Sequence, residues 1–249
     1  MNDSPSSRAA HEIEHGRKLA RLETEHVWGW ATPAGRRRAD RRAELIVCGA
    51  ALAPGKRALE IGCGTGNFTE MFARSGAQIV AVDISPELLE KARGRGLPEA
   101  QVRFLAKPFE QCDVDGPFDA VIGSSILHHL DIRPAMAKIL ALLKPGGAMC
   151  FAEPNMVNPQ ILIQKNVPWI RERLGDSPDE TAFIRGPLRR LLLTTGFENV
   201  SITPFDWLHP ATPRPLIGAV SAAGKLLEKT PLLKEFAGSL LIRACRPAS

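Results

Sequence analysis

The chain has 249 residues, 44% of them hydrophobic, and a formal net charge of +5, which suits one α/β domain with additions and disfavours two complete domains. Its five cysteines form no C-x-x-C pair and show no metal-like spacing with the six histidines, so we expect free thiols in a reducing compartment and no metal site. The polar start lacks the apolar centre of a signal peptide, and no apolar run approaches the about 20 residues of a membrane helix, which favours a soluble, cytoplasmic protein.

The first part of the chain predicts a helical cap that precedes the first strand. Residues 12–25 are charged and helical in character, and residues 36–51 carry spaced alanine, leucine and isoleucine among arginines. These arginines could bind nucleic acid or an anionic membrane, although a solvated helix face is the commoner origin of such a cluster. We therefore expect residues 1–55 to form an N-terminal helical cap outside the sheet, and we expect no nucleic-acid partner.

Residues 58–66 read ALEIGCGTG, an apolar strand that runs directly into a glycine cluster and then a helix. Glycine lets the backbone approach a ligand closely, because it has no Cβ and tolerates positive φ. The helix that follows directs its N-terminal N–H groups at the same place, which favours an anionic group. The next apolar run ends at Asp83, where a carboxylate can accept hydrogen bonds from a ribose diol. Together these features predict binding of an adenosine-containing molecule.

The glycine spacing argues against a nicotinamide dinucleotide. A dinucleotide fingerprint would place its third glycine at position 67, which is Asn67, whereas the third glycine comes one residue early, at Gly66. Alternating glycines after a strand-end glutamate, with an acid after the next strand, resemble the first two motifs of the class I S-adenosylmethionine (SAM)-dependent methyltransferases. A nicotinamide oxidoreductase stays as a rival, and so does a SAM-binding regulator without catalysis.

The resemblance implies roles for individual residues. In that family the glycine loop wraps the methionine part of SAM, the first acid sits near its amino end, and the acid after the second strand holds the ribose hydroxyls. Family members often carry a further acid that contacts adenine where this chain has Lys107 and Pro108, so Glu110 or the backbone beside Phe109 would take that contact. The cofactor-binding residues expected on this basis are Glu60, Gly62, Cys63, Gly64, Gly66, Asn67, Asp83, Ile84, Phe109 and Ser124.

Strands and helices alternate from residue 56 onward, which predicts a parallel sheet covered on both faces. The order of motifs is similar to the class I core, and to its small-molecule branch (methyltransferase type 11/12-like) in particular. The resemblance implies an α/β, Rossmann-like three-layer sandwich with a seven-stranded, mostly parallel sheet whose last strand is antiparallel. Residues 56–249 would form this SAM-binding core, with insertions at 156–186 and 207–236, in a single domain overall.

Candidate catalytic residues follow the fourth predicted strand, at the edge where open α/β sheets bind ligands. His128 or His129 could take a proton from a hydroxyl acceptor, because imidazole titrates near neutrality, but both could equally be structural. Glu153 and Asn155 follow the fifth strand and could bind a polar substrate or stabilise a turn. Tryptophans outside the core strands could line an apolar acceptor pocket, and we expect this of Trp28, Trp30 and Trp207.

These features predict SAM-dependent methyl transfer to a small, hydrophobic acceptor, with oxygen favoured over nitrogen or carbon. A lipid or lipid-linked acceptor is an alternative, because the basic cap and the apolar residues 207–236 could share one face and touch a membrane peripherally. The remaining alternative is the regulator that binds SAM without catalysis.

Overall fold

The structure is a computed structural model that describes residues 7–167, 169–170 and 181–248. Within these residues one seven-stranded sheet has the order β3-β2-β1-β4-β5-β7-β6. The strands are β1 (Arg57–Ile61), β2 (Gln78–Asp83), β3 (Val102–Ala106), β4 (Phe118–Ser124), β5 (Leu143–Pro154), β6 (Glu198–Phe205) and β7 (Ser239–Cys245). The pairs from β3 to β5 are parallel, and β7 is antiparallel to both β5 and β6. The predicted mostly parallel sheet with an antiparallel last strand is confirmed.

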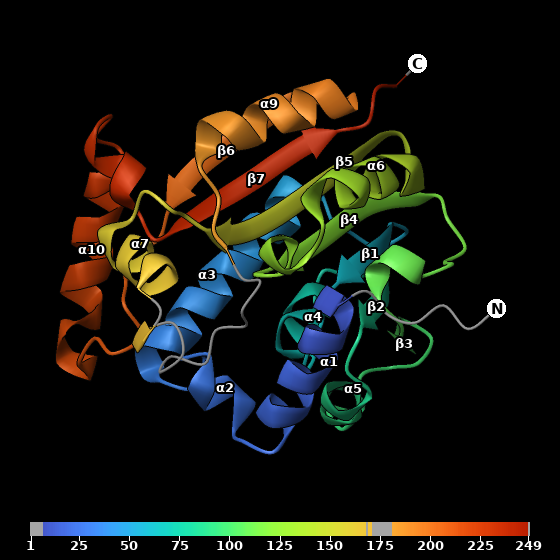
Figure 1. The fold of residues 1–249 in the computed structure, drawn as a ribbon, viewed down its shortest axis with the longest axis horizontal. Helices are drawn as coiled ribbons and strands as arrows, with labels where there is room; N and C mark the ends of the chain where they lie inside the picture. The colour runs from blue at the N-terminus through green and yellow to red at the C-terminus, as the bar shows by residue number, and fades with distance from the viewer. Residues whose placement is uncertain (1–6, 168, 171–180, 249) are drawn as a thin grey trace.

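Helices cover both faces of the sheet and give three layers (Figure 1). Helices α3 (Pro33–Gly49), α4 (Asn67–Ala73) and α5 (Pro86–Arg93) share a core with one face. Helices α6 (Ile132–Leu142) and α9 (Arg185–Thr195) and the 3-10 turn η1 (Phe109–Gln111) pack on the other. Successive side chains of a strand point to opposite faces of the sheet. In β1, Ala58 packs in the core with α3, α4 and α5, and Leu59 packs in the core with α6 and α9.

The remaining helices lie around the edge where the parallel strands end. They are α1 (Ser7–Ala20), α2 (Thr24–Val27), η2 (Leu127–His129), α7 (Pro159–Asn166), η3 (Arg214–Leu216), α10 (Ile217–Leu227) and η4 (Leu233–Phe236). The insertion expected at 156–186 contains α7, where the sequence predicts a helix over 156–175, and residues 168 and 171–180 of it lie outside the described residues. Among the helices described, none is both long and apolar enough to cross a bilayer.

Helix α3 belongs to the layered core although it precedes the first strand. It begins after Thr32, whose hydroxyl accepts a hydrogen bond from the Gly35 N–H at 2.9 Å, with Pro33 in the first turn. Its residues Ala39, Ala43 and Ile46 are buried against the sheet. The division of the chain into a cap of residues 1–55 and a core of residues 56–249 stays a prediction.

The arginine cluster of α3 is largely not a solvated face, so that interpretation of the sequence is wrong for three of its members. Arg38 pairs with Asp206 (N–O 2.8 Å), and Arg41 pairs with Glu228 through two hydrogen bonds of 2.7 and 2.5 Å. Arg42 is only 3% exposed. Three of the arginines that suggested an anionic partner at α3 are therefore paired or buried within the protein.

Candidate active site

A cavity of about 480 Å³ lies at the edge where β1, β2, β4 and β5 end. The predicted cofactor residues that line it are Gly62, Cys63, Gly64, Asn67, Asp83, Ile84 and Ser124. The predicted catalytic and acceptor residues that line it are His128, His129, Trp28, Trp30 and Trp207. The predicted site residues that do not line it are Glu60, Gly66, Phe109, Glu153 and Asn155.

The loop between β1 and α4 requires glycine at three positions, 62, 64 and 66. Gly62 has φ of +67°, and a Cβ there would lie 2.4 Å from the side chain of Ile126. Gly64 and Gly66 also have positive φ, and a Cβ on Gly66 would lie 2.9 Å from Ala92 of α5. Gly66 thus packs the loop against α5, while Gly62 and Gly64 border the cavity.

Asp83, at the end of β2, is fixed by two backbone donors. One carboxylate oxygen accepts from the Gly64 N–H at 2.7 Å, and the other accepts from the Ser85 N–H at 2.9 Å. Burial raises the pKa of Asp83, and these two N–H groups act in the opposite direction. The carboxylate is therefore held rigidly beside the glycine loop, as the family resemblance requires of an acid that binds ribose.

Several buried polar atoms have no hydrogen-bond partner among the described residues, and two of the three named next belong to residues that line the cavity. They include Nε of Arg42, Nδ2 of Asn67 and Oε2 of Glu60. Burial lowers the pKa of Arg42 to about 10, so its guanidinium stays charged at neutral pH, and burial raises the pKa of Glu60 to about 8. An unpaired buried polar group is costly, so the donors of Arg42 and Asn67 mark places where a polar ligand would lower the free energy. The Glu60 carboxyl is mostly protonated at neutral pH, and the Thr69 hydroxyl acts on it against the effect of burial.

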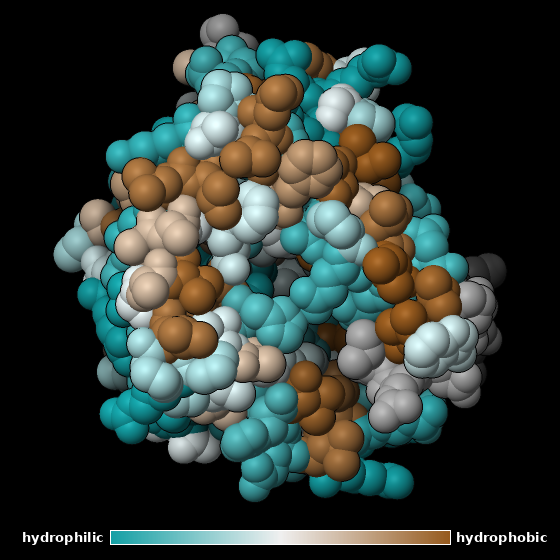
Figure 2. Space-filling view, turned by 90° about the vertical axis from the view of Figure 1, so that its left-hand side faces the viewer, coloured by the Kyte–Doolittle hydropathy of each residue, from teal (hydrophilic) through white to brown (hydrophobic). Residues whose placement is uncertain are grey.

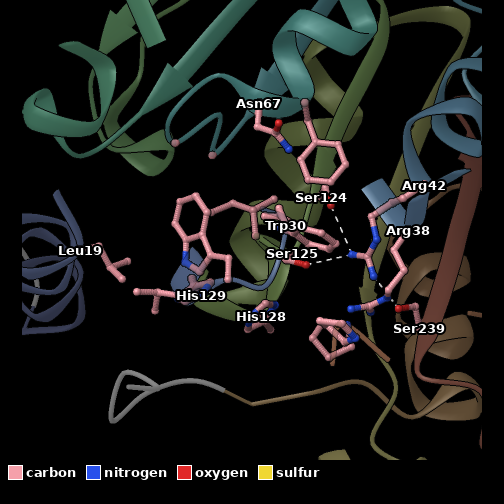
Figure 3. A pocket seen from close by; sticks show the side chains of 18 of the residues that line it. Leu19, Trp30, Arg38, Arg42, Asn67, Ser124, Ser125, His128, His129 and Ser239 are labelled. Atoms are coloured by element: carbon pink, nitrogen blue, oxygen red, sulfur yellow. Dashed lines mark hydrogen bonds between the residues drawn. The ribbon is translucent and has the colours of Figure 1, made fainter. Parts of the chain in front are cut away.

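Arg42 spans the base of the cavity without an ion-pair partner among the described residues. Its Nη1 donates to Ser125 Oγ at 3.0 Å and to the carbonyl of Ala152 at 3.2 Å, and its Nη2 donates to Ser239 Oγ at 2.5 Å. Figure 3 shows the guanidinium directed at Ser124 and Ser125. These neutral acceptors hold the group in place, and the charges of Asp206 and Glu153 favour its protonated form.

The tryptophans lie at different ends of the cavity. Trp28 rests on the glycine loop, because a Cβ on Gly64 would lie 3.0 Å from its ring. The ring of Trp30 has the guanidinium groups of Arg38 and Arg42 at 5.4 Å each. Trp207 lines the cavity at the junction of β6 and the insertion before α10. Trp28 is therefore nearer to the cofactor loop than to an acceptor pocket.

His128 and Glu153 form a buried acid–imidazole pair. Nδ1 of His128 lies 2.6 Å from Oε2 of Glu153, whose other oxygen accepts from the N–H groups of Ile126 and Leu127 at 2.9 Å each. Burial disfavours the charged carboxylate, but the hydrogen bond and charge of His128 and the two N–H groups outweigh it, and the pKa of Glu153 lies below its usual value. With Nδ1–H donated to this carboxylate, the lone pair of the neutral ring lies on Nε2.

Three predicted residues make contacts within the protein, and their assignment to the site stays a prediction. Nδ1 of His129 lies 2.9 Å from Oε2 of Glu12, which joins η2 to α1. The amide of Asn155 donates to the carbonyls of Glu235 and Ala237 at 2.8 Å each, so it holds the segment before β7. Phe109 is 4% exposed within the core under α6. In this arrangement neither Asn155 nor Phe109 presents its side chain to the cavity.

Arg42 is the main site residue that the sequence reasoning missed. Positions 39, 42, 43 and 46 follow the i, i+3, i+4, i+7 spacing of a buried helix face, so an arginine at 42 interrupts an apolar stripe. An arginine in such a place needs a buried partner. This spacing was available in the sequence and could have identified Arg42.

Comparison with known proteins agrees with this geometry. Residues 58–147 match the model of a family described as a methyltransferase domain. Residues 58–147 are a methyltransferase domain. The predicted family and fold are thereby confirmed.

Curated relatives match less than half of this chain. The ubiquinone biosynthesis O-methyltransferase of Xanthomonas campestris pv. campestris (strain B100) is 39% identical over 106 residues, which are 41% of this chain and 44% of that protein. Nodulation protein S of Rhizobium tropici is 28% identical over 124 residues, 48% of this chain and 52% of that protein. The chain spans about half the length of the curated relatives it matches.

A solved structure extends the likeness to the whole fold around the methyltransferase domain. The N-methyltransferase NodS from Bradyrhizobium japonicum WM9, in complex with S-adenosyl-L-homocysteine, aligns with a TM-score of 0.64 at 17% identity. The alignment covers 95% of this chain and 99% of that one. At this identity the likeness concerns the fold alone.

Proposed function

We propose that the protein transfers a methyl group from SAM to a small acceptor, with a hydroxyl oxygen as the favoured nucleophile. One observation carries this proposal. Asp83 and the glycine loop line the same cavity as His128, whose ring is held by Glu153. Similarity to an O-methyltransferase over 41% of the chain supports the choice of oxygen.

The residues around the cavity fit SAM group by group. Asp83 would accept hydrogen bonds from the two ribose hydroxyls. The unpartnered donors of Arg42 and Asn67 suit the carboxylate of the methionine part, and the unpartnered oxygen of Glu60 suits its ammonium. Gly64 allows the ligand to approach the backbone. When bound, SAM supplies an electrophilic methyl group on its sulfonium.

His128 would remove the proton that a hydroxyl acceptor loses. Its Nε2 is the basic nitrogen, and Glu153 stabilises the imidazolium that forms after proton uptake. The rest of the rate would come from holding the acceptor oxygen in line with the methyl group in a site shielded from water. An amine acceptor that enters neutral needs no such base, so the His128–Glu153 pair favours oxygen.

The acceptor end of the cavity suits a small hydrophobic molecule. Ile161, Trp207 and Leu208 contribute to the lining of the cavity and would form this end, whereas Trp30 packs on Arg42 and on Phe68 of α4. Apolar side chains of this kind favour aromatic or aliphatic acceptors, and the polar side chains beside them, such as Gln160 and His209, could orient a polar group of the acceptor. A regulator that binds SAM without catalysis would not need a buried carboxylate to orient His128.

Calorimetric titration with SAM and with S-adenosylhomocysteine tests the cofactor. We expect micromolar affinity for both, after which acceptors are screened with a labelled methyl group. Absence of binding for both ligands would remove the proposal. Tight binding without transfer to any hydroxyl, thiol or amine in the screen would favour the regulator.

Binding of S-adenosylhomocysteine at pH 7 is expected to release close to one proton from Glu60. Burial holds the pKa of this carboxyl at about 8 in the free protein, so it is mostly protonated at pH 7. A ligand ammonium beside it favours the charged form, lowers the pKa and expels the proton, so affinity should also rise as the pH approaches about 8. Calorimetry in two buffers of different ionisation enthalpy measures the release.

The control is Glu60→Gln, which should release no proton and bind S-adenosylhomocysteine about tenfold more weakly. Methylthioadenosine, which lacks the amino acid part, should bind the variant and the parent protein equally. Equal loss for both ligands would contradict the assignment of Glu60 to the ammonium.

A further inference from the structure

Helix α10 presents an apolar surface to solvent. Of its residues only Ile217 and Gly224 are buried, while Leu226 is 67% exposed. Exposed glycine and alanine occupy most of the remaining outer positions, and Lys225 is its single charged residue. A helix of this composition normally packs against something apolar.

The exposed apolar side chains continue from α10 onto its neighbours. Asn158, at the start of α7, donates to the carbonyl of Phe236 in η4 at 2.8 Å, so α7 and η4 lie side by side. We call the surface of α7, α10 and η4 the outer apolar face, with exposed members Leu162, Ile163, Leu226, Leu232, Leu233 and Phe236. Figure 2 shows hydrophobic side chains gathered around a hollow on this side of the molecule.

Helix α7 connects the outer apolar face to the cavity. Its residues Ile161 and Gln164 line the cavity, while the adjacent Leu162 and Ile163 are 47% and 53% exposed to solvent. Whatever covers the outer apolar face therefore lies next to the entrance of the site.

The charge of the face is positive. Three lysines form no ion pair with the described residues: Lys225, Lys229 and Lys234. The acids next to them in the chain pair with arginines instead, Glu228 with Arg41 and Glu235 with Arg185 at 3.1 Å. Lysines that flank exposed leucine and phenylalanine are typical of segments that lie in the interface of an anionic membrane. A second copy of the same face, brought up by a two-fold axis, would set like charges against one another.

We propose that the outer apolar face docks on the surface of an anionic lipid bilayer, with its leucine and phenylalanine side chains among the acyl chains and its lysines at the headgroups. Docked in this way, the molecule directs the entrance of its cavity toward the lipid. Acceptors that partition into the bilayer then reach the site without crossing water. The docking does not depend on the proposed methyl transfer. A protein that binds SAM but does not bind vesicles would contradict the docking and leave the proposed function intact.

Vesicle flotation tests the proposal with the full chain. Vesicles of phosphatidylcholine with phosphatidylglycerol should carry the protein, and vesicles of phosphatidylcholine alone should bind it at least about tenfold more weakly. High salt should weaken the binding to the mixed vesicles, because it screens the lysines.

Two surface variants and a matched control locate the contact. Leu226→Glu and Leu232→Glu should each lower binding to the mixed vesicles by about tenfold or more, because each removes a leucine that enters the acyl region. Leu193→Glu changes a leucine that is 43% exposed on α9, outside the face, and should leave binding unchanged. All three should bind S-adenosylhomocysteine like the parent protein, which shows that they fold.

Three results would overturn the proposal. The first is no binding to the mixed vesicles. The second is equal loss of binding in Leu193→Glu and Leu226→Glu. The third is a dimer in solution that Leu226→Glu dissociates while vesicles are ignored, which would assign the face to a second copy of this chain.

Discussion

Replacing Asp83 with alanine is expected to weaken the binding of S-adenosylhomocysteine by about a hundredfold or more. A carboxylate that accepts hydrogen bonds from two ribose hydroxyls contributes about 1.5–3 kcal/mol for each. The same side chain holds the N–H groups of Gly64 and Ser85, so its loss also loosens the glycine loop. Calorimetric titration of the parent and the variant measures the change.

A truncated ligand and a variant far from the cavity serve as controls for the Asp83→Ala test. Methylthioadenosine retains the ribose, so its affinity should fall in parallel with that of S-adenosylhomocysteine. Asp119→Asn is the control, because Asp119 pairs with Lys144 at 2.9 Å and accepts from the Arg57 N–H, away from the cavity. An Asp83→Ala protein with unchanged affinity would contradict the assignment of Asp83 to the ribose.

Replacing His128 with alanine is expected to lower kcat for a hydroxyl acceptor by about 10²–10⁴, because the acceptor loses its general base. Affinity for S-adenosylhomocysteine should change little, since His128 is assigned to the acceptor. Single-turnover transfer of a labelled methyl group measures the rate. A loss smaller than about tenfold would indicate that the acceptor needs no base, as expected of an amine.

Glu153 acts through His128, and the pH profile of the rate separates this role from a purely structural one. The carboxylate favours the protonated imidazole, so Glu153→Gln should shift the acidic limb of the profile to lower pH as well as reduce kcat. Because Glu153 is wholly buried and binds two backbone N–H groups, Glu153→Asp serves as a second, charged variant. Glu153→Asp should keep the acidic limb of the pH profile where it is in the parent protein. An acidic limb that moves equally in both variants would contradict the proposal that Glu153 acts through His128.

Elements governed by local sequence were predicted closely. The sequence pattern predicts strands over 57–61 and 239–245 and a helix over 86–93, and β1, β7 and α5 have these bounds in the structure. Each combines a clear periodicity with a definite boundary, such as the cap of α5 by Ser85, whose hydroxyl accepts from the Leu88 N–H. β5 was expected at 148–152 but spans Leu143–Pro154, because pairing with β4 and β7 extends it at both ends.

By itself the sequence determined the glycine loop, Asp83 at the end of β2 and the order of strands and helices, because these depend on residues that are neighbours in the chain. Only the tertiary structure decided that Arg42 of α3 lies at the base of the cavity and that Glu153 orients His128. Both contacts join residues far apart in the sequence, across 83 and 25 positions. Such partners are selected by how helices pack on the sheet, and a buried charge acquires its role only when that packing removes it from water.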